Sequence, residues 1–325
     1  MDHSWLPTFW AALIAFALFV YVVRDGYDLG VGILFGFTRD RALRNTMVKA
    51  ISPLWDGNEV WLVLVWASLF GAFPMVYAIL LSAFYLPVTL MLLALIFRGV
   101  SFEFRYLSKN NRLWDWGFFL GSLITSFVQG MVAGGLIQQL PVAGGQYAGG
   151  AFEWLTPFSL LCGAGLAIGY TLLGAAWLVL KTEGDLRDWS YCRLARLLLS
   201  ALAVLGFACA WTFAAQPQVA NRWLEARWLI LFPFSGVLAS LGLWAGVRRR
   251  RDGLPYAMAV VIFLAVLLAF AGSFWPHLIP FTVTIEAASA PVQTLKFLFY
   301  GAGIAVFPLV LFYTGVVYWV LRGKI

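Results

Sequence analysis

The sequence predicts an all-α integral membrane protein with nine transmembrane helices. Hydrophobic residues make up 62% of the 325-residue chain and charged residues only 11%, against about 45–50% and about 25% in ordinary soluble domains. Apolar runs of about 20 residues, the length that crosses a bilayer, recur along the chain. Nearly every residue belongs to such a run or its flanks, so we expect a single polytopic membrane domain over residues 1–325.

Nine segments have the length and apolarity of a membrane span. In chain order they are 7–36, 54–73, 74–98, 113–139, 153–181, 191–215, 227–247, 254–276 and 294–321. The first segment has neither a preceding basic region nor a small-residue cleavage site, so we expect it to remain as a helix and not to be removed as a signal peptide.

The basic residues predict the orientation of these spans, because loops rich in Lys and Arg stay in the cytoplasm. They follow the first, third, fifth, seventh and ninth spans, whereas the opposite loops hold only Arg222, Arg227 and the flanking Lys296. The residues of the predicted cytoplasmic side are Arg39, Arg41, Arg44, Lys49, Arg98, Arg105, Lys109, Arg112, Lys181, Arg187, Arg193, Arg196, Arg248 to Arg251, Arg322 and Lys324. We therefore expect the N-terminus outside and the C-terminus in the cytoplasm. This topology explains the net charge of +7, and nucleic acid is not an expected partner.

A weak internal similarity points to a repeat. "GYDLG" at 26–30 resembles "GYTLLG" at 169–174, in the first and fifth predicted spans; chance is the alternative explanation. A true repeat predicts two four-helix bundles, over 7–139 and 153–276, and a peripheral last helix over 294–321. Thr171 stands where Asp28 would be, so only the first bundle carries the acids.

Four acids occupy the first two spans: Asp25, Asp28, Asp56 and Glu59. An acid in a span costs at least about 2.5–3.5 kcal/mol on the insertion scale, so it is a functional hypothesis by default. The i, i+3 spacing puts each pair on one helix face. Because the two spans are antiparallel and closely connected, we expect the four carboxylates at similar depth near the cytoplasm, with Asn58 able to bridge them.

This grouping predicts a proton pathway from the cytoplasm. Burial and mutual repulsion favour a mixture of protonated and ionised carboxyl groups near neutral pH, which a relay needs. Arg24 is expected to offset part of the negative charge. The alternative is structural: Asp56 and Glu59 complement the dipole at the start of their helix, and Asp25 pairs with an arginine or caps a kink near Gly26.

Small residues in the spans are interpreted as packing residues. The glycines of the first span are expected to form a seam for close helix packing: Gly26, Gly30, Gly32 and Gly36. The cysteines form no CxxC pair and are interpreted as buried small hydrophobic residues: Cys162, Cys192 and Cys209.

The histidines bear on cofactors. His3 precedes the first span and His277 follows the eighth, whereas a haem buried among helices needs axial ligands such as His facing into the core. We therefore expect no haem or metal held by side chains of this chain. A cation-coupled secondary transporter that uses the acids as its ion site is the alternative class, although it should carry polar groups in both halves, and spans five to nine hold almost no ionisable residue.

Five ordered motifs carry a resemblance to a known family. They are "RDGYDLGVGILFG", "ISPLWDGNEVWLV", "FPMVYAILLSAFYLPV", "FRGVSFEFR" and "WDWGFFLGSL". They cover about residues 20 to 125, and a weaker match returns in "FPLVLFYTGVVYW" at 307–319. The sequence resembles subunit II of the cytochrome bd quinol oxidase family, including its cyanide-insensitive branch.

The resemblance implies a subunit of a bacterial inner-membrane complex that oxidises quinol and reduces oxygen to water, taking protons from the cytoplasm without pumping them. It implies that subunit I holds haem b and haem d together with the quinol-oxidising loop, and that this nine-helix chain packs on it as a heterodimer and stabilises it. The isolated chain is then expected to catalyse nothing. A structural quinone and a small single-helix accessory subunit occur in some members, and both are further candidate partners, as is membrane lipid.

The motifs also carry residue roles over from the family. Asp56 matches an aspartate assigned to the proton pathway, and Asp25 and Asp28 match the acids beside it. Trp61 matches a tryptophan near the proposed oxygen entrance, and Glu59 occupies a position that is Gln in some members.

Two further features of the resemblance concern the arginines and the chain length. Arg98 and Arg105 belong to a family motif for which a structural snorkelling or salt-bridge role is expected, with a functional role as the alternative; Arg24 is also expected to be structural or charge-pairing. Two departures are a short outside loop between spans six and seven and a minimal tail after Arg322, so the accessory subunit and the quinone do not carry over automatically.

Overall fold

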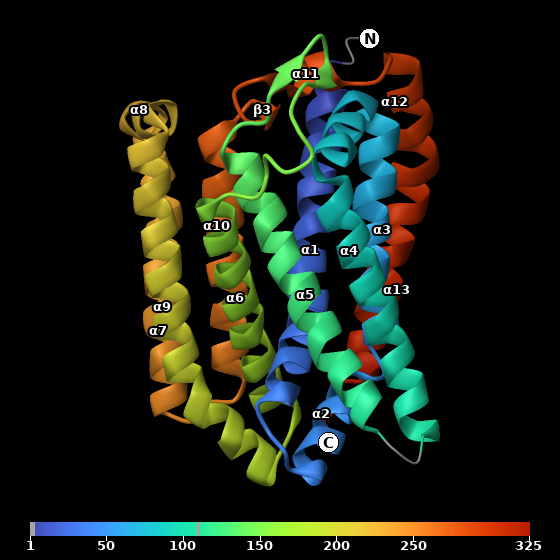
Figure 1. The fold of residues 1–325 in the computed structure, drawn as a ribbon, viewed down its shortest axis with the longest axis vertical. Coiled ribbons are helices and arrows are strands. Elements are labelled where there is room, and N and C mark those ends of the chain that lie inside the picture. The colour runs from blue at the N-terminus through green and yellow to red at the C-terminus, as the bar shows by residue number, and fades with distance from the viewer. Residues whose placement is uncertain (1–3, 109–110) are drawn as a thin grey trace.

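The structure, a computed structural model, is a bundle of long helices that run close to its longest axis (Figure 1). It describes residues 4–108 and 111–325, so His3 and Lys109 of the predictions above lie outside it. The helices are α1 (Trp5–Gly36), α2 (Arg41–Ile51), α3 (Trp55–Ala72), α4 (Pro74–Leu107), α5 (Arg112–Ile137), α6 (Pro157–Lys181), α7 (Gly184–Ala215), α8 (Pro217–Glu225), η1 (Arg227–Ile230), α9 (Leu231–Arg248), α10 (Gly253–Phe274), α11 (Ile285–Ala288), α12 (Val292–Leu298), η2 (Phe299–Val306) and α13 (Phe307–Val320). The strands are β1 (Val142–Ala143), β2 (Gln146–Tyr147), β3 (His277–Ile279) and β4 (Val283–Thr284).

Within the described ranges, 8 helices are long and apolar enough to cross a membrane. They correspond to eight of the predicted spans. The remaining predicted span, 54–73, forms α3, whose first turns carry Asp56, Asn58 and Glu59 and are correspondingly polar. The all-helical membrane architecture is therefore confirmed, whereas the count of nine spans and the orientation of the termini stay predictions.

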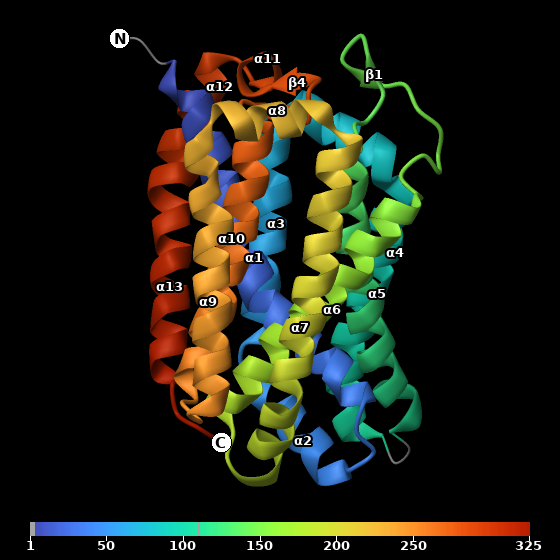
Figure 2. The ribbon, with the colours of Figure 1, turned by 90° about the vertical axis from the view of Figure 1, so that its left-hand side faces the viewer.

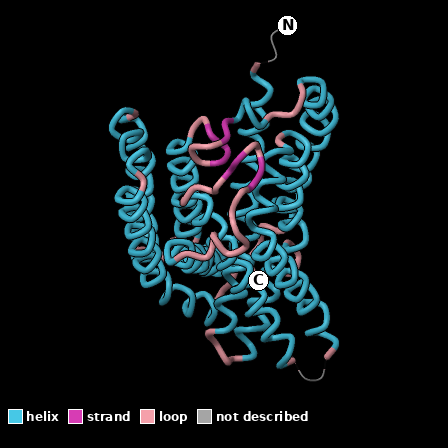
Figure 3. Tube along the Cα trace, turned by 45° about the horizontal axis from the view of Figure 1, so that its top comes forward, coloured by secondary structure: helices cyan, strands magenta, loops and turns pink. Residues whose placement is uncertain are grey.

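Helix α1 lies at the centre of the bundle and packs against α3, α5 and α6. Helices α7, α8 and α9 stand at one side of the molecule and α12 and α13 at the other (Figure 1). The N-terminus and the C-terminus lie at opposite ends (Figure 2). The two hairpins, β1 with β2 and β3 with β4, pair antiparallel and lie towards the end that carries the N-terminus (Figure 3).

Local sequence explains several helix limits. Asp40 caps α2, because its Oδ1 accepts from the backbone N–H of Ala42 at 2.7 Å, a geometry that satisfies an N–H left free at a helix start. Thr156 begins α6 with a capping box and Pro157 in the first turn, where the missing N–H of proline has no cost. Helix α4 is interrupted at Phe84, which has non-helical angles three residues before Pro87, as expected where a proline removes a helical hydrogen bond.

The glycine seam predicted for α1 is confirmed. A Cβ placed on Gly30 would lie 1.8 Å from the carbonyl oxygen of Tyr170, so only glycine allows α1 and α6 to approach this closely. On the facing helix, a Cβ on Gly174 would lie 2.5 Å from the carbonyl carbon of Gly30. The two segments with similar sequences, 26–30 and 169–174, therefore pack against each other.

The prediction that all three cysteines are buried is wrong. Cys192 and Cys209 are exposed, and Cys162 is half-buried. Both exposed cysteines lie on α7, and only 6% of the apolar window of this helix is buried within the chain. Because α7 stands at the side of the bundle, only one of its faces packs against the core, and Cys192 and Cys209 lie outside that face.

Some boundaries and connections also differ from the predictions. Helix α4 continues to Leu107 and α7 begins at Gly184, because helices extend past the apolar segment that a hydropathy test detects. The amphipathic helix α2 fills the first predicted cytoplasmic loop. The last predicted span consists of α12, the π-helical η2 and α13.

Candidate functional site

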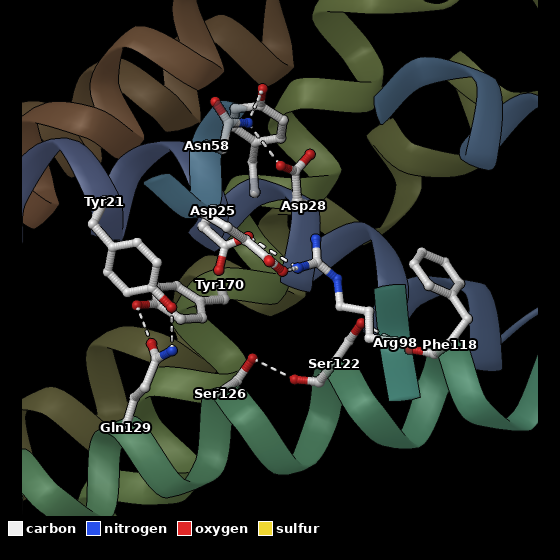
Figure 4. Close-up of polar contacts among 12 residues, drawn as sticks. Tyr21, Asp25, Asp28, Asn58, Arg98, Phe118, Ser122, Ser126, Gln129 and Tyr170 are labelled. Carbon is white, nitrogen blue, oxygen red and sulfur yellow. Dashed lines mark hydrogen bonds and ion pairs between the residues drawn. The ribbon is translucent and has the colours of Figure 1, made fainter. Parts of the chain in front are cut away.

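The candidate site is built around two carboxyl groups in the buried part of α1. Asp25 and Asp28 lie one turn apart, and both are 0% exposed. Arg98 reaches them from α4 and is also fully buried. Its Nη1 donates to Asp25 Oδ1 at 3.1 Å and to Glu59 Oε1, on α3, at 2.7 Å. We call Asp25, Asp28, Glu59 and Arg98 the carboxylate cluster; Figure 4 shows Asp25, Asp28 and Arg98 side by side.

Close packing of α4 on α5 accompanies the burial of Arg98. At Gly121 of α5, a Cβ would lie 2.7 Å from the carbonyl oxygen of Ala94 and 2.9 Å from Arg98 Cβ. A buried guanidinium is costly unless opposite charge and hydrogen bonds compensate it. Asp25 and Glu59 provide that compensation from two different helices.

Asp28 has a different environment. Its Oδ2 accepts from Asn58 Nδ2 at 2.7 Å, and the same nitrogen donates to the Tyr27 hydroxyl at 2.9 Å. The Tyr318 hydroxyl, from α13, donates to Asn58 Oδ1 at 3.0 Å and lies 2.5 Å from the Tyr27 hydroxyl. We call Tyr27, Asn58 and Tyr318 the hydroxyl–amide ring. It joins Asp28 to the last helix.

A second set of polar side chains lies beside Asp25 (Figure 4). Gln129 of α5 donates through Nε2 to the Tyr21 hydroxyl at 2.5 Å and accepts through Oε1 from the Tyr170 hydroxyl at 2.8 Å. On the same helix, Ser126 Oγ donates to the carbonyl oxygen of Ser122 at 2.7 Å. These groups extend the polar region of α1 towards α5 and α6.

Several atoms of the cluster have spare hydrogen-bonding capacity. Asp25 Oδ2, Asp28 Oδ1 and both Nε and Nη2 of Arg98 are buried without a hydrogen-bond partner in the described part of the chain. Buried polar atoms are normally paired. The cluster can therefore hold further protons or polar groups at these positions.

The structure brings together three of the four predicted acids. Asp25, Asp28 and Glu59 lie near Arg98, whereas Asp56 is exposed and its carboxyl makes no hydrogen bond or ion pair to any residue in the described ranges. Asn58 joins Asp28 to two tyrosines and does not bridge one carboxylate to another. Asp56 lies in the first turn of α3, where an acid complements the helix dipole.

The functional and structural interpretations differ at Asp28. The proton-pathway interpretation and the structural interpretation are both compatible with an ion pair between Asp25 and an arginine, and Arg98 makes this pair. Among the residues that the structure describes, however, no cation lies within ion-pair distance of Asp28, which is fully buried. Helix capping and charge pairing therefore do not account for this second acid, and its role in a proton pathway stays a prediction.

The other predicted residues have clear positions. The guanidinium of Arg24 lies 3.9 Å from the ring centroid of Tyr318, so Arg98, and not Arg24, makes the ion pairs of the cluster. Arg105 pairs with Asp115 through Nε at 2.8 Å, as expected for a charge-pairing residue. Trp61 is 0% exposed and packs edge-on against Phe307, with ring centroids 5.8 Å apart; its place at an oxygen entrance stays a prediction.

The positions of possible haem and metal ligands bear on the expectation that this chain holds no cofactor, which stays a prediction. His277 is the one histidine among them; it lies in β3, with Nδ1 3.3 Å from the carbonyl oxygen of Phe274. In the described ranges, no group of three or more His, Cys, Asp or Glu is arranged to hold a metal ion. Within the described part of the bundle, axial ligation by histidine therefore has no donor, whereas buried methionines such as Met91 and Met131 are present.

Sequence reasoning missed the tyrosines and Gln129. Gln129 could have been found, because it is an amide in the middle of an apolar run. Tyr27 and Tyr318 could not, because aromatic residues are common in membrane helices and 291 positions separate the two.

Comparisons with known proteins identify the family. The family model "Cytochrome bd terminal oxidase subunit II" matches residues 6–321. The chain belongs to this family. The resemblance carried by the five motifs is thereby confirmed, and this subunit II is part of an oxygen-reducing, haem-containing oxidase complex with a partner subunit. Its apolar helices make it a multi-pass membrane protein, and the family implies the bacterial inner membrane.

Individual relatives agree with this assignment. The chain is 29% identical over 367 residues to cytochrome bd-I ubiquinol oxidase subunit 2 of Escherichia coli (strain K12), with 100% of this chain and 96% of the relative covered. It is 31% identical over 261 residues to cytochrome bd ubiquinol oxidase subunit 2 of Bacillus subtilis (strain 168), with 78% and 75% covered. A chain of the bd oxidase structure from Geobacillus thermodenitrificans superposes with a TM-score of 0.81 at 17% identity, and 98% of both chains is covered. That likeness supports the fold.

Proposed function

We propose that this subunit II belongs to a quinol:oxygen oxidoreductase, stabilises the haem-bearing subunit I and delivers protons from the cytoplasm for the reduction of oxygen to water. The names of the relatives support quinol as the electron donor. The observation that carries the proton role is the pairing of buried Arg98 with buried Asp25 and with Glu59, whose side chain is 27% exposed. This pairing links the surface to the interior.

The proposed route begins at the exposed carboxyl of Asp56 and continues through Glu59 to Asp25 and Asp28. The cluster holds three carboxyl groups and one guanidinium: Arg98 pairs with Asp25 and Glu59, whereas Asp28 accepts a hydrogen bond from the neutral amide of Asn58. Because uncompensated negative charge is costly inside a membrane, a proton bound within the cluster lowers its energy. A site of this kind takes up a proton from one side and releases it to the other, which is what a relay does.

Haem b and haem d, which we assign to subunit I, supply electron transfer and oxygen binding when present. The residues of this chain act only on protons: each carboxyl oxygen accepts a proton from the cytoplasmic side and passes it on. Reduction of one oxygen molecule to two water molecules consumes four protons and four electrons. The chain therefore does no redox chemistry by itself.

The part of α3 that bears Asp56 and Glu59 supports contact with a partner. An acid exposed to lipid is costly, so this surface is expected to face either water or another polypeptide. A partner that covers α3 would protect Glu59 from lipid and would be stabilised by the contact.

The topology belongs to the same proposal. Arg41, Arg44 and Lys49 lie on α2, close to the end of the molecule that carries the C-terminus (Figure 1). Placing this end in the cytoplasm satisfies the preference of basic loops. The packing of 26–30 on 169–174 supports an internal repeat over 7–139 and 153–276, with 294–321 as the additional peripheral segment of the single membrane domain.

The test uses the complex purified through a tag on this chain in mild detergent. We expect haem b and haem d bands in the reduced-minus-oxidised spectrum, together with a second membrane polypeptide. We expect Asp25→Asn to lower oxygen consumption about tenfold or more, in the range of positioned proton-transfer groups, at unchanged haem content. Glu153→Gln, an exposed acid in the loop before α6, is the control.

Two results would contradict the proposal. Unchanged turnover with Asp25→Asn would remove Asp25 from the pathway. A pure, colourless single chain that moves cations by itself would replace the oxidase role with that of a transporter.

A further inference from the structure

The hydroxyl–amide ring fixes the direction of each of its hydrogen bonds. Asn58 Nδ2 carries two hydrogens, which go to Asp28 Oδ2 and to the Tyr27 hydroxyl. Tyr318 gives its single hydroxyl hydrogen to Asn58 Oδ1. The 2.5 Å contact between the hydroxyls must therefore be donated by Tyr27 and accepted by Tyr318. Each polar hydrogen of the ring therefore has one defined acceptor.

This arrangement determines which end of the Asn58 amide faces Asp28. An ionised carboxylate only accepts hydrogen bonds, so it is stabilised by Nδ2 and repelled by Oδ1. Without Tyr318 as donor, Oδ1 would lose its partner and the amide could rotate about its terminal bond. An amide turned in this way would place Asn58 Oδ1 against the Asp28 carboxylate, and both groups only accept hydrogen bonds.

Tyr318 is itself held in place by neighbours that do not touch Asp28. The guanidinium of Arg24 lies 3.9 Å from its ring centroid, and Trp177 packs against it at 6.1 Å. Beyond the end of α13, Lys181 Nζ donates to the carbonyl oxygens of Leu321 and Gly323. The last helix is thus anchored close to the hydroxyl that contacts Asn58.

We propose that Tyr318 is a positioning residue of subunit II: together with Tyr27 it holds the Asn58 amide in the orientation that donates to Asp28, and so orients that carboxyl for proton transfer. The inference rests on the proposed role of Asp28 in the proton pathway. It assigns a role in that pathway to α13, which contributes no acid to it. Tyr318 acts through Asn58, and its hydroxyl is the functional group.

Tyr318→Phe tests the proposal, because it removes the hydroxyl and keeps the ring under Arg24 and beside Trp177. We expect kcat for oxygen consumption by the purified complex to fall about three- to tenfold, which corresponds to the loss of one hydrogen bond. KM for quinol and haem content should not change. Tyr313→Phe, which removes an exposed hydroxyl from the same helix, is the matched control and should keep full activity.

Coupling to Asn58 separates positioning from a general structural effect. Tyr318→Phe should cause no additional loss in an Asn58→Ala complex, because the amide through which it acts is gone. Losses that multiply in the double variant would overturn the proposal, as would a Tyr318→Phe complex indistinguishable from the Tyr313→Phe control. If Tyr318→Phe fails to assemble with haem, Tyr27→Phe breaks the same ring and should show the same fall and the same coupling.

Asp28→Asn distinguishes failure of this inference from failure of the proposed function. A slow Asp28→Asn complex with a normal Tyr318→Phe complex rejects the positioning role alone. Normal turnover with Asp28→Asn rejects the role of Asp28 in proton delivery, and the inference that depends on it falls too.

Discussion

At the scale of single residues, the buried acids of the site differ in whether a positive charge pairs with them. Asp25 is paired with Arg98, whereas Asp28 is held by the neutral amide of Asn58. Glu59 shares Arg98 and is 27% exposed. Solvent exposure decreases from Asp56 through Glu59 to the two buried aspartates, so these four acids lead from the surface inward.

Removing Arg98 should destabilise the protein more than removing one acid. Arg98→Met leaves Asp25 buried without a cation, and breaking a buried pair in this way costs about 3–5 kcal/mol. We expect a lower thermal midpoint and a lower yield of the haem-containing complex. Adding Asp25→Asn to Arg98→Met should recover part of the stability, because the unpaired charge is gone; a double variant no more stable than Arg98→Met would refute the pairing argument.

Asp56→Asn should separate function from folding. Asp56 is exposed and makes no ion pair to a described residue, so its replacement should change stability by no more than about 0.5 kcal/mol. If it admits protons, oxygen consumption should fall while haem content and thermal midpoint stay the same. Loss of haem together with protein would indicate a folding role, and unchanged turnover would remove Asp56 from the route.

At the scale of elements, close approach of helices positions the cluster. Gly30 lets α1 contact the backbone of α6, and Gly121 lets α5 contact α4 beside Arg98. Since Asp25 and Asp28 lie within two turns of Gly30, the distance between α1 and α6 controls where both carboxyl groups point. Helix packing and the polar site are therefore coupled through the same stretch of α1.

Gly30→Ala tests this coupling. Its Cβ would collide with the Tyr170 carbonyl oxygen, and overpacking of this kind costs about 1–3 kcal/mol. We expect a lower thermal midpoint and a lower turnover per haem. Gly206→Ala on α7 is the matched control, because a Cβ there meets nothing within 4 Å and alanine is the better helix former. Equal effects of the two substitutions would show that the α1–α6 contact can relax.

At the scale of the whole molecule, the sequence predicted what depends on local composition. Apolar runs indicated the helical membrane fold, and the intramembrane acids indicated the site. Contacts between distant segments were not predictable: Arg98 and Asp25 are 73 positions apart, and Tyr318 and Asn58 are 260 apart. No local pattern tells which arginine a buried acid will meet, because the choice depends on how the helices pack.

The end of the chain is joined to the α9–α10 connection by a second charge network. Asp252 accepts from Arg187 Nη2 at 2.7 Å, from Tyr191 at 2.8 Å and from Lys324 Nζ at 2.5 Å. Burial by itself would raise the pKa of Asp252, but these hydrogen bonds outweigh it and hold the pKa well below its usual range. Ionised Asp252 thus links α7, α10 and the segment that follows α13.

The pH dependence of this network follows from the sign of the shift. A carboxyl whose pKa is lower in the folded state stabilises the fold above its unfolded pKa, about 3.9 for Asp, and loses that contribution as the pH falls towards the folded value. We therefore expect Asp252→Asn to lower the thermal midpoint of the purified complex by a constant amount between pH 6 and 8, and the difference from the unmodified protein to shrink below about pH 4. Asp185→Asn, an acid in the first turn of α7 outside this network, is the control. Because Lys324 anchors the chain beyond Tyr318, Asp252→Asn should also loosen the attachment of α13. If the difference in thermal midpoint between Asp252→Asn and the unmodified protein persists unchanged at low pH, Asp252 stabilises the molecule by packing and not by its charge.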